Sequence, residues 1–176
     1  AGIPALTYGP PGVAGAGTAF ALAAGGAEVV VVDSVLPGQA TAAGAGIIQP
    51  WSSSAEGSTY GLYAAGAAYY PTLIERLAEV GVADIGYRVT GSLVAQADAA
   101  RLDEVEERLR RRTAGVAVAG TVERLGERDA RALFPPLAPE LGAVYVSGGA
   151  RVDGRMLRAG LLAGARRLGA VVVDAP

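Results

Sequence analysis

Apolar residues at the start of the chain fall into short runs and longer stretches, separated by glycines. A short run over 5–8 predicts a strand, and the alanine-rich residues over 13–24 have helical spacing. Residues 28–32, Glu28 and four valines, follow and end at Asp33, and unbroken valines are typical of a parallel strand that is buried on both faces. The pattern therefore predicts a strand, a helix and a second strand at the start of the chain.

Periodicity along the rest of the chain predicts four more helices and several strands. A long helix is expected over 58–80, with Pro71 inside it as a kink or a break and Gly81 as its C-cap. Two short strands, 87–90 and 92–95, are joined at Gly91 and are predicted to form a hairpin. The remaining elements are a charged helix over 98–112 capped by Asp98, a strand over 121–125, a helix over 127–133, a strand over 142–147, a helix over 155–168 capped by Asp153, and a final valine strand.

The first strand–helix–strand unit carries the dinucleotide-binding fingerprint, in which glycines follow the first strand and an acid ends the second. Gly12 lets the backbone approach a pyrophosphate, and Gly15 lets the helix pack closely on the sheet. The amides of Val13 and Ala14 lie at the positive end of the helix, and Asp33 can accept hydrogen bonds from ribose hydroxyls. The sequence therefore predicts a nucleotide site, with a purely structural strand–helix–strand unit as the alternative.

The turn before this helix departs from the fingerprint. Pro10 stands at the first glycine position and Pro11 follows it, although proline fixes φ and has no N–H. Two explanations stay open: Gly9 takes the role of the first glycine, or the sequence at the start of the chain contains an assignment error.

Strand–helix–strand patterns at both ends of the chain bracket a β-containing stretch. We expect residues 1–80 and 150–176 to form a Rossmann-like nucleotide-binding part, and residues 81–149 to form part of a substrate domain. The fold class is α/β, a Rossmann-like domain with an inserted α+β segment. Because the final valines read as a strand that has barely begun, we expect the chain to be the first half of a longer protein.

The composition of the chain excludes several kinds of partner and of catalytic chemistry. A net charge of −2 argues against nucleic acid or an anionic membrane as a partner, and no apolar run reaches the roughly 18 residues that a membrane span needs. No basic, apolar leader is visible, so we expect a cytoplasmic protein. The sequence holds no cysteine, histidine or lysine. Within this chain, that excludes thiolate chemistry, Ser-His-Asp catalysis, Cys/His metal sites and a lysine Schiff base, and we expect no metal.

The segment after the second strand carries a resemblance to a known family. Its residues are Asp33-Ser34, Pro37 to Thr41 and Ala42 to Pro50, with further support at 84–93, 125–136 and 142–153. On these residues the chain resembles the superfamily of FAD-dependent D-amino-acid oxidases and glycine oxidases. The resemblance covers nearly the whole chain and matches roughly the N-terminal half of a family member.

The resemblance implies FAD as the cofactor and a role for each matching residue. Val13 and Ala14 would contact the pyrophosphate through their amides. Asp33 would bind the adenosine ribose, with Ser34 adjacent to it. The family resemblance implies these roles, and the dinucleotide-binding fingerprint predicts the same roles for Val13, Ala14 and Asp33.

The resemblance also places the small-residue segment beside the flavin. Ala40 and Thr41 would line the phosphate and ribitol region. Ala45, Gly46 and Ile47 would run along the isoalloxazine ring, where glycine and alanine permit close backbone approach. A flexible surface loop is the alternative interpretation of this glycine-rich segment.

The activity that the resemblance implies is oxidation of an amino acid or secondary amine by hydride transfer from its α-carbon to flavin N5, followed by hydrolysis of the imino product. In this family the residues that bind the substrate carboxylate come from the C-terminal half, so no catalytic residue is assigned. Two alternatives stay open: another FAD- or NAD-dependent oxidoreductase on the Rossmann scaffold, or a non-catalytic nucleotide-binding fragment that needs a partner chain. A homo-oligomer also stays open.

Three other side chains have two interpretations each. Trp51 either covers the flavin or the substrate entrance, or anchors the local structure. Arg88 either meets a carboxylate or is a solvated residue at a strand edge. Arg151 lies close to Asp153 in the sequence, and we expect it to belong to a turn network rather than to a site.

Overall fold

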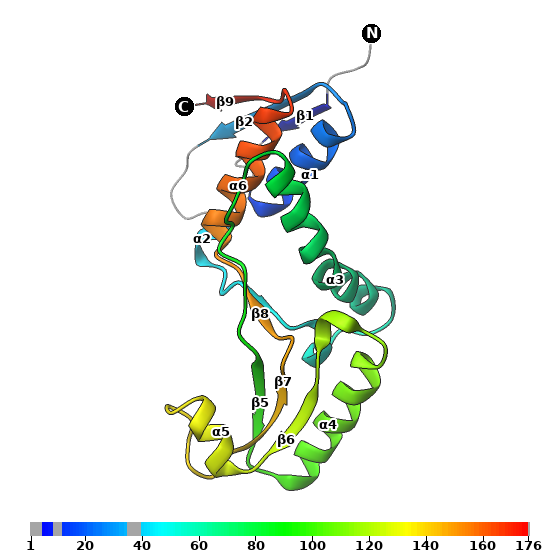
Figure 1. The fold of residues 1–176 in the computed structure, drawn as a ribbon, viewed down its shortest axis with the longest axis vertical. Helices are drawn as coiled ribbons and strands as arrows, with labels where there is room; N and C mark the ends of the chain where they lie inside the picture. The colour runs from blue at the N-terminus through cyan, green and yellow to red at the C-terminus, as the bar shows by residue number, and fades with distance from the viewer. Residues whose placement is uncertain (1–4, 9–11, 35–39, 176) are drawn as a thin grey trace. The chain divides into compact units, whose positions relative to one another are not determined.

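The computed structural model describes residues 5–8, 12–34 and 40–175, and it divides the chain into two units. Unit 1 comprises 1–46, 71–87 and 152–176, and unit 2 comprises 47–70 and 88–151. The prolines of the predicted phosphate turn, Pro10 and Pro11, lie outside the described residues. Figure 1 shows the elements of both units along the chain.

Unit 1 is built on a parallel sheet with the strand order β1-β2-β9. Its elements are β1 (Ala5–Tyr8), α1 (Val13–Ala24), β2 (Val29–Ser34), α2 (Ala40–Ala43), the second part of α3 (Gly57–Glu79), α6 (Gly154–Arg167) and β9 (Val171–Ala175). Valines pair with valines across β2 and β9, from Val30 with Val171 to Val32 with Val173. The predicted strand–helix–strand unit is thus present, with α1 at the bounds that the sequence predicts.

Small residues let the helices of unit 1 approach closely. Ala16 and Ala19 on α1 are completely buried, as is Ala165 on α6. A Cβ atom added to Gly164 would lie 3.0 Å from the Phe20 ring and a Leu77 methyl, so these side chains would have to shift to admit a larger residue. Alanine and glycine therefore set the spacing of α1, α3 and α6 in this core.

The predicted helix ends in unit 1 are confirmed. Asp153 caps α6 by accepting hydrogen bonds from the amides of Arg155 (2.9 Å) and Met156 (3.0 Å). After α3, Gly81 adopts a φ of 83°, which glycine reaches without a Cβ penalty. The amides of Gly81 and Val82 then close the helix on earlier carbonyls, each at 2.8 Å.

Unit 2 contains two antiparallel sheets, with the strand orders β3-β8-β4 and β5-β7-β6. Its strands are β3 (Ile47–Ile48), β4 (Arg88–Val89), β5 (Ser92–Gln96), β6 (Val122–Leu125), β7 (Gly142–Val146) and β8 (Ala150–Arg151). Its helical elements are η1 (Pro50–Ser52), the first part of α3, α4 (Ala99–Thr113), η2 (Ala117–Ala119) and α5 (Glu127–Leu133).

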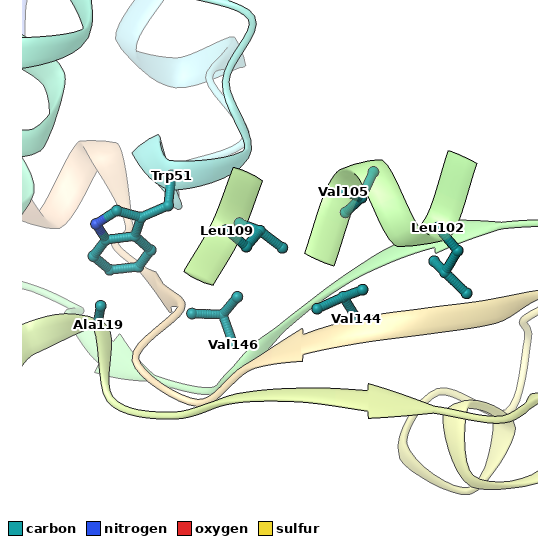
Figure 2. Close-up of a cluster of buried hydrophobic side chains, with 7 residues drawn as sticks. All are labelled: Trp51, Leu102, Val105, Leu109, Ala119, Val144 and Val146. Carbon is teal, nitrogen blue, oxygen red and sulfur yellow. The ribbon is translucent and has the colours of Figure 1, made fainter. Parts of the chain in front are cut away.

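The core of unit 2 lies between α4 and one face of the sheet β5-β7-β6 (Figure 2). The sheet contributes Val144 and Val146, which alternate on β7 and so point to the same face. The helix contributes Leu102, Val105 and Leu109, at the spacing of one helical face. Trp51 joins this cluster with an exposed fraction of 1%, so it anchors η1 and does not cover an entrance.

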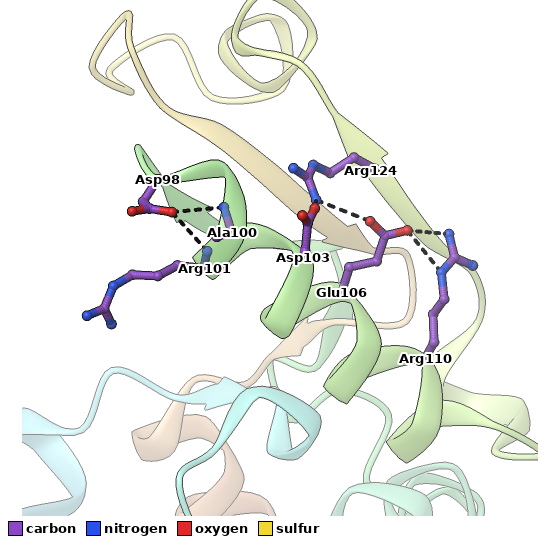
Figure 3. Close-up of polar contacts among 7 residues, drawn as sticks. All are labelled: Asp98, Ala100, Arg101, Asp103, Glu106, Arg110 and Arg124. Carbon is purple, nitrogen blue, oxygen red and sulfur yellow. Dashed lines mark hydrogen bonds and ion pairs between the residues drawn. The ribbon is translucent and has the colours of Figure 1, made fainter.

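Charged side chains of α4 and β6 form a set of polar contacts (Figure 3). Asp98 caps α4 by accepting from the amides of Ala100 (2.8 Å) and Arg101 (3.1 Å), as predicted. Arg124 on β6 forms ion pairs with Asp103 (2.8 Å) and Glu106 (3.3 Å) on α4, and Glu106 also pairs with Arg110 (2.7 Å). The charged side of α4 is therefore exposed to solvent, and its ion pairs with Arg124 connect it to the sheet at β6.

The predicted hairpin around Gly91 is wrong. β4 pairs with β8, whereas β5 pairs with β7, so the two strands belong to different sheets. The amides of Thr90 and Gly91 both donate to the carbonyl of Gly149, at 3.0 and 2.8 Å. The chain therefore crosses from one sheet to the other at Gly91, because its partners are strands far along the sequence.

The observed units also differ in extent from the predicted domains. Residues 47–70 were expected in the nucleotide-binding part, but they group with unit 2. The reason is that Trp51 is buried in the core beneath α4. The assignment of nucleotide and substrate binding to separate parts of the chain stays a prediction.

The described residues lack two further features. No helix there is long and apolar enough to cross a membrane. Within the same residues, no three metal-ligating side chains come together.

Candidate functional site

The N-terminus of α1 is the centre of the predicted site. Gly12 is the N-cap residue, in an extended conformation, and no side chain of its own caps the helix. The first amides of a helix have no partner within it. Here the amide of Val13 donates to the hydroxyl oxygen of Thr41 at 3.0 Å. The structure thus brings together three of the predicted cofactor-binding residues, although Thr41 is 28 positions away from Val13 in the sequence.

Space at this N-terminus is tight. A Cβ atom on Gly12 would lie 2.9 Å from the Thr41 hydroxyl oxygen, so a larger residue would displace that side chain. A Cβ atom on Gly154, the first residue of α6, would lie 2.6 Å from the Thr41 carbonyl oxygen. Thr41 therefore contacts the first residues of both α1 and α6. The N-terminus of α1 carries positive partial charge, which favours an anionic ligand, whereas that of α6 is already capped by the Asp153 carboxylate.

Gly46 is held by a different contact. Its carbonyl accepts a hydrogen bond from the amide of Val152 at 2.8 Å, directly beyond the pairing of β3 with β8. Its φ is 67°, and a Cβ atom would collide with the Val152 carbonyl. Packing inside the protein is thus sufficient to explain glycine here. Ala45 before it and Ile47 after it are exposed, with 73% of Ile47 accessible.

Gln49 follows this segment and has an unusual environment. Both polar atoms of its side-chain amide are buried, and neither has a hydrogen-bond partner in the described part of the chain. Buried amides nearly always have partners, because desolvation without a replacement bond is costly. The segment around β3 therefore contains an unsatisfied donor and acceptor.

The sheet β3-β8-β4 arranges three side chains that the sequence did not connect. Ile47 lies directly opposite Arg151, and Arg151 lies directly opposite Arg88. Directly opposite residues of antiparallel strands share one face of the sheet. Arg151 belongs to β8 and not to the expected turn network, since Ala150 and Val152 on either side are buried while Arg151 is exposed. The alternation of apolar and polar residues over 150–152 is the sign of this strand that the sequence itself contains.

The other predicted residues are placed only in part. Asp33 and Ser34 end β2, where their backbones pair with Asp174 and Ala175 of β9. Ala40 begins α2. The structure describes only the backbone at these predicted positions. Of the remaining two, Ala14 is exposed and Gly15 is half-buried in the first turn of α1.

The model of the family named DAO, the FAD-dependent oxidoreductases, matches residues 11–175. The chain belongs to this family. FAD is the cofactor of the family, so the predicted family, α/β fold class and cofactor are confirmed.

Several members of the DAO family are similar to this chain. The uncharacterized oxidoreductase YurR from Bacillus subtilis (strain 168) is 42% identical over 163 residues, which are 92% of this chain and 44% of the relative. The crystal structure of iminodiacetate oxidase (IdaA) from Chelativorans sp. BNC1 is 44% identical, with a TM-score of 0.90 over 99% of this chain and 47% of that chain. Glycine oxidase from Geobacillus kaustophilus is 26% identical, with a TM-score of 0.77 over 97% of this chain and 46% of that chain.

This DAO-family chain spans less than half the length of the relatives that it matches. The likeness extends over nearly all of its own residues, so it includes both units. The roles of individual cofactor-binding residues stay predictions.

Proposed function

We propose that this DAO-family oxidoreductase oxidises an amino acid or a secondary amine. The observation that carries the proposal is the likeness to iminodiacetate oxidase over 99% of the chain, at 44% identity. Iminodiacetate is a secondary amine with two carboxylates. The 26% identity to a glycine oxidase supports the same class of substrate, an amine next to a carboxylate.

The residues at the N-terminus of α1 fit the pyrophosphate of FAD. The Thr41 hydroxyl accepts from the amide of Val13 and donates to no described residue. A hydroxyl has one proton to donate, so this proton is left for a phosphate oxygen. Since the Val13 amide is used by Thr41, we assign the direct backbone contact to Ala14, and we propose that Val13 fixes the orientation of Thr41.

The residues around β3 fit a flat, partly apolar ring. Ile47 presents an exposed apolar side chain, and Ala45 and Gly46 add little bulk before it. The unsatisfied amide of Gln49 offers both a donor and an acceptor. These features support the predicted placement of the segment 45–47 along the isoalloxazine ring.

FAD, when bound, supplies the oxidation by taking a hydride from the carbon next to the amine nitrogen, and dioxygen or another acceptor later takes the electrons. The imine that results is hydrolysed by water to a carbonyl compound and an amine or ammonia. The chain's own residues hold the cofactor and exclude water from the ring. Thr41 contributes a hydrogen bond, and Ile47 contributes apolar cover.

An absorption spectrum of the purified protein tests the proposal, with the heat-released cofactor identified by mass. We expect a flavin band, released FAD, and bleaching of the band when iminodiacetate or glycine is added without oxygen. Thr41→Val should weaken FAD binding by about tenfold, because one hydrogen bond to a charged group is lost, whereas Thr41→Ser should retain it. A colourless protein that takes up no FAD would contradict the proposal. Binding of FAD that requires a second polypeptide would favour the alternative of a non-catalytic fragment that needs a partner chain.

A further inference from the structure

Two arginines and one isoleucine occupy one face of the small sheet in unit 2. The register pairs Ile47 with Arg151 and Arg151 with Arg88, so the three side chains stand in a row across β3, β8 and β4. All three residues are exposed. Neighbouring strands are about 4.8 Å apart, so Arg151 starts about 5 Å and Arg88 about 10 Å from Ile47.

Two of the three side chains in the row are arginines. None of the three strands carries an acidic residue. Arg151 makes no hydrogen bond or ion pair with the described part of the chain. A guanidinium binds a carboxylate through two parallel hydrogen bonds, which a lysine cannot reproduce. The exposed guanidinium of Arg151 therefore suits a carboxylate on a ligand.

We propose that Arg151 binds the second carboxylate of the substrate and so selects amines that carry two carboxylates over amines that carry one. The proposal rests on the proposed function, because it takes Ile47 as the residue that marks the position of the ring. Arg151 is then the nearer arginine to the reacting group and Arg88 the more distant one. Arg151 acts through the charge and geometry of the bound substrate and takes no part in electron transfer.

The test measures binding separately from turnover. Thiodiacetate and (methylthio)acetate have a sulfur where the amine nitrogen would stand, and they differ by one carboxylate. Each is titrated into the FAD-loaded protein, and the change in the flavin absorption spectrum gives its dissociation constant. The same titrations are made with Arg151→Gln, Arg151→Lys and the control Arg101→Gln. Arg101 is also an exposed arginine of unit 2, but it lies on α4.

We expect the wild-type protein to bind thiodiacetate at least tenfold more tightly than (methylthio)acetate. Arg151→Gln should weaken thiodiacetate binding by about 10- to 100-fold and (methylthio)acetate binding by less than about threefold. Arg151→Lys should fall between, because it keeps the charge and loses the paired hydrogen bonds. Arg101→Gln should change neither. In turnover, Arg151→Gln should raise the KM for iminodiacetate and leave its kcat nearly unchanged.

Several results would overturn the proposal. Equal weakening of both ligands by Arg151→Gln would show that the arginine does not read the second carboxylate. An unchanged thiodiacetate affinity in that variant, or no preference for the dianion in the wild-type protein, would also reject it. These outcomes require a flavin band, so they are distinct from failure of the proposed function. A protein without FAD would reject both the function and this inference.

Discussion

Arg112 offers a sharp test of how one side chain stabilises unit 2. Its guanidinium donates to the carbonyls of Trp51 (3.2 Å), Ser53 (2.6 Å) and Ala55 (2.8 Å), and it stacks on the ring of Tyr60 at 4.2 Å from the centroid. One residue at the end of α4 thus holds the segment that follows β3. Arg112→Met keeps the aliphatic stem and removes the charge and the donors.

The magnitude follows from these contacts. A hydrogen bond to a charged group contributes about 1.5–3 kcal/mol, and an exposed cation–π contact contributes about 0.5–1 kcal/mol. The side chain is half-buried, so water can replace part of what is lost. We therefore expect Arg112→Met to lower the free energy of unfolding by about 2–4 kcal/mol. With a denaturant slope of about 2 kcal/mol per molar urea, the midpoint should fall by about 1–2 M.

The assay is urea unfolding followed by tryptophan fluorescence. Trp51 is the only tryptophan in the sequence, and it is buried in the same core, so its emission reports on unit 2. The matched control is the neighbouring Arg111→Met. Arg111 pairs with Glu107 at 3.4 Å in an exposed contact, which predicts a change of less than about 0.5 kcal/mol. Equal midpoints for the two variants, at equal slope, would refute the reasoning.

Three further predictions concern a cap, the core and pH. Asp98→Ala should lower the free energy of unfolding in urea by about 1 kcal/mol, whereas Asp98→Asn should retain most of the cap of α4. Equal losses in the two variants would argue against a capping role for Asp98. Leu109→Ala, at a fully buried position, should cost about 2–5 kcal/mol, whereas Leu62→Ala at a site 72% exposed should change stability by less than about 0.5 kcal/mol in the same assay. Burial raises the pKa of the Tyr87 phenol above its usual value of about 10, which favours the neutral form in the folded state. The resulting stabilisation is present below about pH 10 and is lost as the pH rises further. The thermal midpoint should therefore fall more steeply above pH 10 in the wild-type protein than in Tyr87→Phe, and parallel curves would contradict this.

Local patterns in the sequence were sufficient to predict most of the individual helices and strands. The bounds of α1 follow from alanine spacing and the glycines after it, and α5 ends before a pair of prolines. Asp98 and Asp153 were recognised as caps because their carboxylates lie just before helical runs. The family resemblance then identified the segment around Thr41, which the structure brings to the N-terminus of α1.

Pairing between distant strands could not be predicted in the same way. Residues on both sides of Gly91 have strand composition, but their partners, β8 and β7, lie far along the chain. The row of Ile47, Arg151 and Arg88 depends on that same pairing. A shift of one residue in register would place Arg151 on the opposite face, so spacing alone could not reveal the row.

The edge of the larger sheet in unit 2 has a consequence for association. In the described part of the chain, β6 pairs with β7 along one side only. An unpaired edge can add a strand from another molecule, and charged residues oppose this. Glu123 and Arg124 place both signs of charge on β6, and Arg124 is held there by its ion pairs with α4. We therefore expect these charges to oppose self-association through this edge, an effect that a measurement of folding stability would not detect.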